Sequence, residues 1–487
     1  MSSSYFTDLA QQYIDGEWRP GTGAWDIIDV NPYDGEKLAS ITIAAADEID
    51  LAYRAAERVQ RDWAETNAFT RRAVIERALR LVEEREDEIA EAIIAELGGT
   101  RVKAGFELHL AKEFLRESIG LATTEQGRLI PSPVEGKENR LFRVPVGVVG
   151  VISPFNFPFL LSLKSVAPAL ALGNGVVLKP HQDTPVCGGT LIAKIFEDAG
   201  LPPGLLNVVI TDIAEIGDAF IEHPVPKVIS FTGSDKIGRH VAVVCAGGFK
   251  RALLELGGNS ALVVLEDADL DYAVDAAVFS RYVHQGQVCM AANRILVDRS
   301  VAAEFTEKFV AKVRSLKTGD PRDPDTVIGP VINASQAEMI SASVEQALAE
   351  GATALLRGET RDNLIEPSVL TDIPADSPLL REEIFGPVAL LIPFDGEEEA
   401  VRLVNDTPYG LSGAVHTGDP ERGVRFARRV DTGMFHVNDG TVHDEPLVPF
   451  GGEKNSGVGR LNGESTVDAF TSLKWVSVQT GRSGFPF

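Results

Sequence analysis

The chain contains one cysteine in a setting that suits a nucleophile. Cys289 stands in the stretch Gln285–Met290, where glycine and glutamine surround it in place of an apolar run. Inert structural cysteines usually lie in apolar stretches, as Cys187 and Cys245 do, whereas a reactive thiolate needs a polar and accessible setting. The local sequence alone is equally compatible with a nucleophile and with a small core residue at position 289.

Two further residues have the side chains that a cysteine nucleophile requires. Glu255 interrupts an apolar stretch before two glycines, and burial there would raise its pKa towards that of a general base. A glutamate paired with a basic residue at a strand end is an equal alternative. Asn156 follows a strand-like stretch among aromatic residues, where its amide can donate to a developing oxyanion. In isolation, a turn residue that caps its own backbone is the better interpretation of Asn156. His284 and His443 are weaker candidates for a base, since satisfied or surface histidines are commoner.

A third pattern suits the binding of phosphate and ribose groups. Phe231–Ser234, followed by Gly238, places a glycine and a hydroxyl between a strand and a helix, where backbone amides and the helix dipole favour an anion. The stretch is neither GxGxxG nor a Walker motif, so its signal is weak alone. Lys179 ends another strand and can reach a ribose hydroxyl, although a solvated surface lysine would look the same.

The elements that carry these residues alternate between strands and helices. Residues 47–117 show a helical pattern that Gly98 and Gly99 interrupt. The strands that follow are apolar on both faces, which is typical of a parallel, doubly wound sheet. Such sheets bind dinucleotides at the carboxyl ends of their strands. The expected strands are 146–152, 175–179, 206–210, 227–231 and 251–256, and the expected helices are 185–199, 213–222 and 234–245.

The alternation begins again after Gly258, which predicts a second α/β domain. The tail, residues 472–479, alternates between apolar and polar side chains and predicts a strand added to another sheet, in this subunit or in a neighbour. In the second domain the expected strands are 261–265, 295–297, 390–393 and segments near Ala414 and Phe435, and the expected helices are 302–316, 335–349 and 397–404.

Composition excludes several classes of partner. The 487 residues include 46 basic and 71 acidic ones, and the net charge of −25 disfavours nucleic acid and anionic membranes. Three cysteines form neither a disulfide framework nor a metal-ligand pattern, which suits a cytoplasmic protein without a metal. We expect no secretory signal and no transmembrane helix.

Taken together in this order, the motifs resemble those of the aldehyde dehydrogenase superfamily, and the resemblance spans almost the whole chain. Any one of them is unspecific, but their common order makes coincidence improbable. The matching segments are residues 154–158, 179–180, 231–234, 255–258, 286–289, 383–387 and 449–452.

The resemblance implies a role for each residue. Cys289 is the expected nucleophile, Glu255 the base that activates water, and Asn156 forms an oxyanion hole with the backbone N–H of Cys289. Lys179 and Glu383 are expected to hold ribose hydroxyls. The whole cofactor set comprises Ser153, Pro154, Phe155, Lys179, Gln182, Phe231, Gly233, Ser234, Glu255, Leu256, Gly257, Glu383 and Phe385.

The family fold also implies a division of the chain. Residues 1–120 and 141–254 are expected to form a Rossmann-like parallel-sheet domain that binds NAD(P), and residues 255–446 a second α/β catalytic domain. Residues 121–140 and 467–487 are expected to form a small β oligomerisation element. A homodimer or a homotetramer follows from that element.

The sequence predicts cofactor and substrate choice at positions where it differs from many family members or matches one branch of the family. Many NAD-preferring members carry a glutamate three residues after the ribose lysine, and the neutral Gln182 here predicts that NADP serves alongside NAD. Residues 284–290 and 444–446 look like those of the benzaldehyde and vanillin dehydrogenase branch. Phe157, Met290 and Phe450 are therefore expected to line an apolar tunnel for an aromatic aldehyde, unless they are ordinary core residues.

Two rival functions follow from the same motifs. An acylating dehydrogenase would pass the thioester to coenzyme A, but Glu255 is suited to activate water. A non-catalytic structural protein on this scaffold would not need the complete set of catalytic residues.

Overall fold

Five parallel strands form the centre of the first sheet in the computed structural model, which describes residues 4–124 and 127–487. They follow the order β9-β8-β7-β10-β11 across the sheet. Antiparallel strands extend both edges of this sheet. The bounds are β7 Val148–Ile152, β8 Gly175–Lys179, β9 Leu206–Val208, β10 Pro226–Thr232 and β11 Arg251–Glu255, with β1 Gln12–Ile14, β2 Glu17–Arg19 and β23 Gly457–Val458 at the edges.

The strand order reverses between β7 and β10. The chain moves outward from β7 through β8 to β9, and then returns to place β10 on the other side of β7. In an open α/β sheet the loops at such a point diverge and leave a crevice at the carboxyl ends of the strands. The doubly wound sheet predicted from the sequence is therefore confirmed, and its switch point fixes where a ligand site can form.

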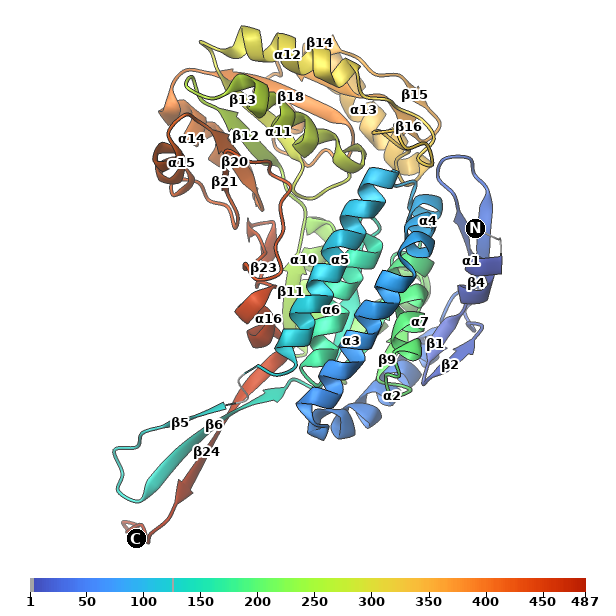
Figure 1. The fold of residues 1–487 in the computed structure, drawn as a ribbon, viewed down its shortest axis with the longest axis vertical. Helices are drawn as coiled ribbons and strands as arrows, with labels where there is room; N and C mark the ends of the chain where they lie inside the picture. The colour runs from blue at the N-terminus through green and yellow to red at the C-terminus, as the bar shows by residue number, and fades with distance from the viewer. Residues whose placement is uncertain (1–3, 125–126) are drawn as a thin grey trace.

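Helices cover both faces of this sheet. Gly98 ends α4 in the left-handed conformation at φ +69°, as the sequence predicts. In Figure 1, α3, α5 and α6 stand together in front of the sheet. The helices are α2 Ala46–Glu65, α3 Ala68–Glu84, α4 Glu86–Leu97, α5 Arg101–Leu121, α6 Pro158–Ala171, η1 Val186–Thr190, α7 Leu191–Asp198 and α10 Asp235–Gly247.

One expected helix is wrong. Residues 213–222 do not form a single helix but two short ones, α8 (Ile213–Ile216) and α9 (Ala219–Glu222). Gly217 lies between them at φ +54°, ψ −130°, a conformation that no α-helix accommodates. Apolar side chains of this segment instead line a cavity that is described below.

The second sheet also has a parallel centre, and it lies above the first in Figure 1. Its order is β14-β17-β18-β13-β12-β20-β21, with only β14 antiparallel within this sheet. The elements are β12 Ser260–Val264, β13 Ala292–Asp298, β14 Thr353–Leu356, β17 Ser368–Thr371, β18 Val388–Phe394, β20 Gly413–His416, β21 His436–Val437, α11 Leu270–Tyr282, α12 Ala302–Arg314, α13 Ala334–Glu350, α14 Glu397–Asn405 and α15 Pro420–Ala427.

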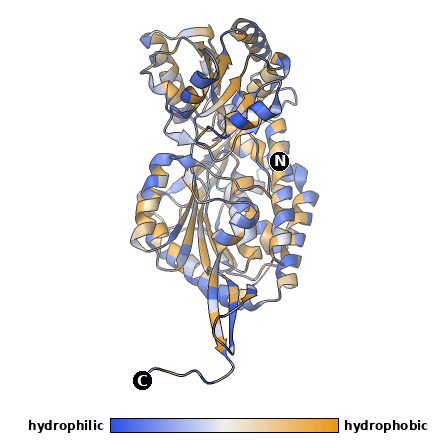
Figure 2. Ribbon diagram, turned by 90° about the vertical axis from the view of Figure 1, so that its left-hand side faces the viewer, coloured by the Kyte–Doolittle hydropathy of each residue, from blue (hydrophilic) through white to orange (hydrophobic). Residues whose placement is uncertain are grey.

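A three-stranded antiparallel arm projects from the body (Figures 1 and 2). It consists of β5 (Gly127–Ile130), β6 (Lys137–Pro145) and β24 (Thr471–Gln479), in the order β24-β6-β5. The tail strand expected from the sequence is present, and it pairs with β6 of its own chain along nine residue pairs. Apolar side chains on the arm, including Leu129 and Trp475, remain largely exposed.

Shorter elements complete the fold. These are α1 Ser4–Leu9, β3 Asp26–Val30, β4 Lys37–Thr42, α8, α9, η2 Val283–Gly286, β15 Thr360–Arg361, β16 Leu364–Ile365, η3 Pro378–Leu380, β19 Tyr409–Gly410, β22 Glu453–Lys454 and α16 Gly463–Phe470. Among the helices of the described residues, none combines the length and the apolar character that a membrane crossing requires.

Candidate active site

A cavity of about 540 Å³ opens at the carboxyl ends of β7, β8, β10 and β11, where the second sheet's loops close over the first sheet. Every catalytic and cofactor residue predicted from the sequence lines it. From the first sheet these are Ser153, Pro154, Phe155, Asn156, Lys179, Gln182, Phe231, Gly233, Ser234, Glu255, Leu256 and Gly257, and from the second domain Cys289, Glu383 and Phe385.

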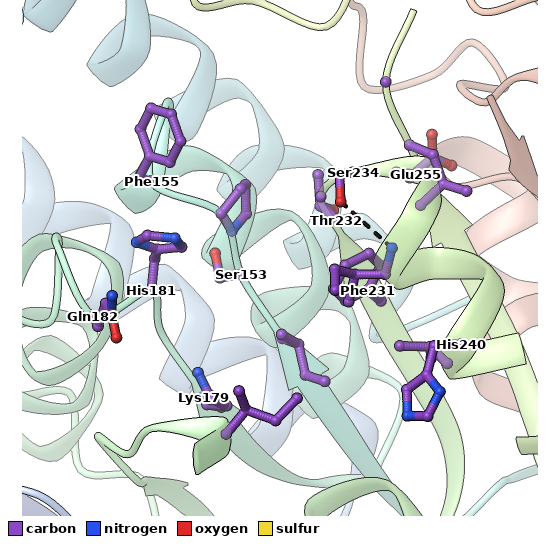
Figure 3. A pocket seen from close by; sticks show the side chains of 18 of the residues that line it. Ser153, Phe155, Lys179, His181, Gln182, Phe231, Thr232, Ser234, His240 and Glu255 are labelled. Carbon is purple, nitrogen blue, oxygen red and sulfur yellow. Dashed lines mark hydrogen bonds between the residues drawn. The ribbon is translucent and has the colours of Figure 1, made fainter. Parts of the chain in front are cut away.

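Figure 3 shows how the polar residues are distributed around this cavity. Gln182 and His181 lie on one side, while Ser234 and Glu255 lie on the other. Ser234 is the N-cap of α10, and its hydroxyl accepts a hydrogen bond from the backbone N–H of Ile237 at 3.4 Å. The amino end of α10 therefore faces the cavity from the side of Ser234, in the arrangement that favours an anion.

Sequence reasoning missed the apolar wall of the cavity. Ile213, Ile216 and Phe220 come from the broken helical segment after β9, and they line the cavity with Val241 of α10. These residues belong to no sequence motif. They share only an apolar character, and the break at Gly217 lets them face the same cavity. Further lining residues without a predicted role are Ile152, His181, Thr211, Asp212, Gly217, Ile221, Thr232, Ile237, His240, Gln336 and Met339.

Lys179 and Glu383 approach the cavity from opposite domains. Burial lowers the pKa of Lys179 to about 8, against the opposing influence of the Asp212 carboxylate. Burial raises the pKa of Glu383 to about 7, although its Oε1 accepts the Gly258 N–H at 2.9 Å. A Cβ on Gly257 would lie only 2.5 Å from Glu383 Oε2, so the close approach of this carboxyl group requires glycine there.

Cys289 stands on a loop with an unusual backbone. His284 and Gln285 both adopt left-handed conformations, at φ +52° and +54°, and such conformations cost about 1–3 kcal/mol each for residues other than glycine. The loop is held by Arg281, whose guanidinium donates to the carbonyl oxygens of Gly286 and Ile384 at 3.2 and 2.9 Å. These contacts compensate for the strain and fix the thiol at the cavity wall.

The Cys289 thiol is protonated at neutral pH in this state. Burial raises the pKa of Cys289 to about 12, and the neighbouring Glu383 and Glu255 carboxylates add to the rise. A nucleophilic thiolate therefore requires a nearby group that accepts the proton.

Two hydrogen-bond donors stand beside the thiol. The Asn156 Nδ2 donates one N–H to the carbonyl oxygen of Gln287 at 3.0 Å, and the amide carries a second N–H. Within residues 4–124 and 127–487 that second N–H and the backbone N–H of Cys289 have no hydrogen-bond acceptor. Both groups are thus available to a ligand oxygen next to the thiol.

Glu255 is the candidate proton acceptor. Its side chain is buried at the end of β11, and Oε2 has no hydrogen-bond partner in the described part of the chain. Burial raises the pKa of Glu255 to about 8, while the Lys164 ammonium opposes the rise and Asp444 reinforces it. A carboxyl group with this pKa exchanges protons readily near neutral pH.

A buried ion pair behind Glu255 was not predicted from the sequence. Lys164 Nζ lies 2.7 Å from Asp444 Oδ2, and Asn462 Nδ2 donates to Asp444 Oδ1 at 2.8 Å. The same ammonium lies 3.5 Å from the centroid of the Phe450 ring. Phe450 precedes Gly451, whose Cβ position would be 3.1 Å from Glu255 Oε1, so the pair belongs to the surroundings of the base.

The three predicted substrate residues lie outside the cavity lining. Phe157, Met290 and Phe450 are all buried. Phe157 follows Asn156 and Met290 follows Cys289 in the chain, while Phe450 packs against Lys164. Their role in substrate binding stays a prediction. No cluster of three His, Cys, Asp or Glu side chains able to hold a metal ion occurs among the described residues.

Comparison with known proteins identifies the architecture. The model of the aldehyde dehydrogenase family matches residues 18–476. The chain belongs to the aldehyde dehydrogenase family. A benzaldehyde dehydrogenase of Bacillus subtilis is 55% identical over 99% of both chains. A vanillin dehydrogenase of Corynebacterium glutamicum is 47% identical over 97% of this chain and 98% of its own. The crystal structure of an NAD-dependent benzaldehyde dehydrogenase from the latter organism superposes with a TM-score of 0.89, at 44% identity over 97% and 98% of the two chains.

The Lys164–Asp444 pair leads to a prediction about pH. Because an ammonium beside Glu255 lowers its pKa, K164M raises that pKa, and D444N lowers it by removing a carboxylate. If ionised Glu255 activates the water that hydrolyses a thioester on Cys289, as the sequence predicts, the hydrolysis rate in the unmodified enzyme rises with pH around a midpoint near 8. Quench-flow measurement of acyl-enzyme decay between pH 6 and pH 10 should show the midpoint displaced upward in K164M and downward in D444N. K164R, which keeps the cation, serves as the control, and displacement of both variants in one direction would contradict the electrostatic account.

Proposed function

We propose that this enzyme oxidises aromatic aldehydes to carboxylic acids, with NAD or NADP as the hydride acceptor. The observation that carries the proposal is the position of Cys289, Glu255 and Asn156 in the lining of one cavity at a topological switch point. The likeness to a benzaldehyde and a vanillin dehydrogenase over nearly the whole chain supports the aromatic substrate class.

In the proposed reaction the protein first forms a covalent adduct. Glu255 accepts the thiol proton of Cys289, and Sγ bonds to the aldehyde carbon. The carbonyl oxygen becomes an oxyanion that accepts hydrogen bonds from Asn156 Nδ2 and from the Cys289 N–H; one such donor stabilises the transition state by about 3 kcal/mol. A nicotinamide held in this cavity would accept a hydride from the carbon of the adduct, and loss of that hydride would leave a thioester on Cys289.

Glu255 then acts a second time. After losing the first proton to solvent, the carboxylate takes a proton from water, whose oxygen bonds to the thioester carbon. The C–S bond breaks, the acid leaves, and Cys289 is regenerated. A buried carboxyl group with a pKa near 8 suits both transfers, and it favours transfer of the acyl group to water over transfer to coenzyme A.

The lining residues fit a dinucleotide in chemical type. We assign Lys179 and Glu383 to the ribose hydroxyls, and the backbone at Gly233 and Ser234 to the pyrophosphate. The apolar wall from α8 and α9 offers a surface for the adenine ring. The rest of the predicted cofactor set, Ser153, Pro154, Phe155, Gln182, Phe231, Glu255, Leu256, Gly257 and Phe385, surrounds the same cavity.

We also propose a function for each part of the chain. Residues 1–120 and 141–254 bind the cofactor, residues 255–446 carry the catalytic cysteine, and residues 121–140 with 467–487 join subunits into a homodimer or homotetramer. The exposed apolar side chains of the arm support the last assignment. The three free cysteines support a cytoplasmic location.

The first test of this function compares substrates and cysteine variants. The purified enzyme should oxidise benzaldehyde and vanillin with a higher kcat/KM than aliphatic aldehydes, as measured by NADH absorbance. C289S should abolish oxidation but bind NAD with unchanged affinity, because the thiol forms the covalent bond and does not hold the cofactor. C245S, at a buried cysteine of α10, is the matched control and should keep its activity. A strong preference for aliphatic aldehydes would refute the substrate class, and oxidation by C289S would refute the nucleophile.

The second test concerns cofactor choice. Gln182 is exposed at the cavity and carries no charge to repel a 2′-phosphate, so both NAD and NADP should support turnover. Q182E should lower kcat/KM for NADP about tenfold and leave that for NAD nearly unchanged. Q182A, which is neutral, should keep the use of NADP. Exclusion of NADP by the unmodified enzyme would show that another group determines the choice.

A further inference from the structure

A buried carboxylate from α5 caps the helix that follows Asn156. Glu107 is fully buried, and its Oε1 accepts the backbone N–H groups of Phe159 and Leu160 at 3.0 and 3.1 Å. These two residues belong to the first turn of α6, which begins at Pro158. The contact joins two segments that are about fifty positions apart in the sequence.

Helix α6 has no capping group of its own. Its N-cap residue is Phe157, which has no side-chain oxygen, and Pro158 at the first helical position has no N–H. The next two N–H groups are those that Glu107 accepts, and Leu161 donates to the Phe157 carbonyl at 2.9 Å. The first turn of α6 therefore depends on Glu107 for its hydrogen bonds.

A buried lysine connects this cap to the aromatic residue next to Asn156. Lys103 lies one turn before Glu107 on α5, and its ammonium pairs with Glu107 Oε2. Lys103 Nζ is also 4.5 Å from the centroid of the Phe157 ring. On another side that ring packs edge-to-face against His284, at 5.5 Å between centroids, on the loop that carries Cys289. One ion pair thus contacts both the start of α6 and the residue before it.

We propose that Glu107, held by Lys103, is a positioning residue for the oxyanion hole. Asn156 immediately precedes Phe157, so the direction in which the chain enters α6 determines where the Asn156 amide points. Its Nδ2 must meet the Gln287 carbonyl and the substrate oxygen together, and a displacement of about 1 Å can lower a rate about a hundredfold. Glu107 touches neither substrate nor cofactor in this assignment and acts only through Asn156.

The chain contains a matched control for this role. Glu96 on α4 is also fully buried, and its two oxygens accept the N–H groups of Val186 and Cys187 at 2.8 and 2.7 Å, at the start of η1. Both glutamates therefore satisfy two N–H groups at the start of a helix, Glu107 through one oxygen and Glu96 through two. The helix capped by Glu96 carries none of the residues assigned to the chemistry, so E96A reports the effect of losing a buried cap without a change next to Asn156.

The inference rests on the proposed function and is tested by a double-mutant cycle. E107A, E96A, N156A and E107A/N156A are compared by their melting temperature, NAD affinity and rate of the first NADH burst with benzaldehyde. We expect E107A to slow the burst about tenfold or more with unchanged NAD affinity, and E96A, at a similar melting temperature, to keep the unmodified rate. In the N156A background the E107A change should add little, because the group on which it acts is absent.

The outcomes separate the two proposals. The positioning role would be overturned if E107A and N156A lowered the burst rate by independent factors that multiply in the double variant. It would also be overturned if E107A and E96A lowered the burst rate equally. Either result would leave the proposed function intact. Absence of aldehyde oxidation in the unmodified enzyme would overturn both. If E107A does not fold, E107Q replaces it in the same cycle, because a neutral amide oxygen accepts the two backbone N–H groups more weakly than a carboxylate does and loses the ion pair with Lys103. The role is supported if E107Q slows the burst and if this slowing is absent in the N156A background. A burst at the unmodified rate in E107Q contradicts the role.

Discussion

Removal of ionisable groups from water is the constraint on which the site depends. Burial raises the pKa values of Cys289, Glu255 and Glu383 and lowers that of Lys179, and in each case burial is the largest cause. In the proposed mechanism one of the two carboxyl groups that oppose ionisation of the thiol, that of Glu255, accepts its proton. The base and the nucleophile of the proposed mechanism are therefore removed from water together, in the cavity between the carboxyl edge of the first sheet and the loops of the second.

The scaffold holds this arrangement by satisfying buried polar groups across long distances in the chain. Arg281 joins the strained loop before Cys289 to the carbonyl of Ile384, Glu107 completes the first turn of α6, and Lys164 with Asp444 places a cation and an anion behind Glu255. Each of these contacts fixes a segment next to Cys289, Asn156 or Glu255 and does not involve the reactive residue itself. Removing one partner of such a buried pair leaves an uncompensated group, which lowers the stability of the fold.

Much of the site could be predicted from the sequence because its chemistry lies in short, local motifs. Asn156, Glu255 and Cys289 each stand in a stretch whose composition is unusual for its position, and the alternation of strands and helices places such stretches at one edge of a sheet. The Lys164–Asp444 pair could not be predicted, since its members are 280 positions apart and nothing in either stretch indicates its partner. The same holds for the cap at Glu107, where the only local sign is a proline and a phenylalanine at a helix start that lacks a capping side chain. The break at Gly217 was missed because apolar periodicity continues through it, and only the cavity reveals what those side chains face.

The central claim is that the aldehyde carbon becomes bonded to Cys289 and is released by water activated at Glu255. Mass spectrometry of the E255Q variant after mixing with benzaldehyde and NAD tests it most directly. Loss of the acceptor for the thiol proton should slow the first step in E255Q. The account nevertheless predicts that NADH formation stops at one equivalent, with one benzoyl group per subunit on the peptide that contains Cys289 and very slow release of benzoate. Stoichiometric NADH formation without an acyl group on that peptide, or multiple turnovers at the unmodified rate, would contradict it.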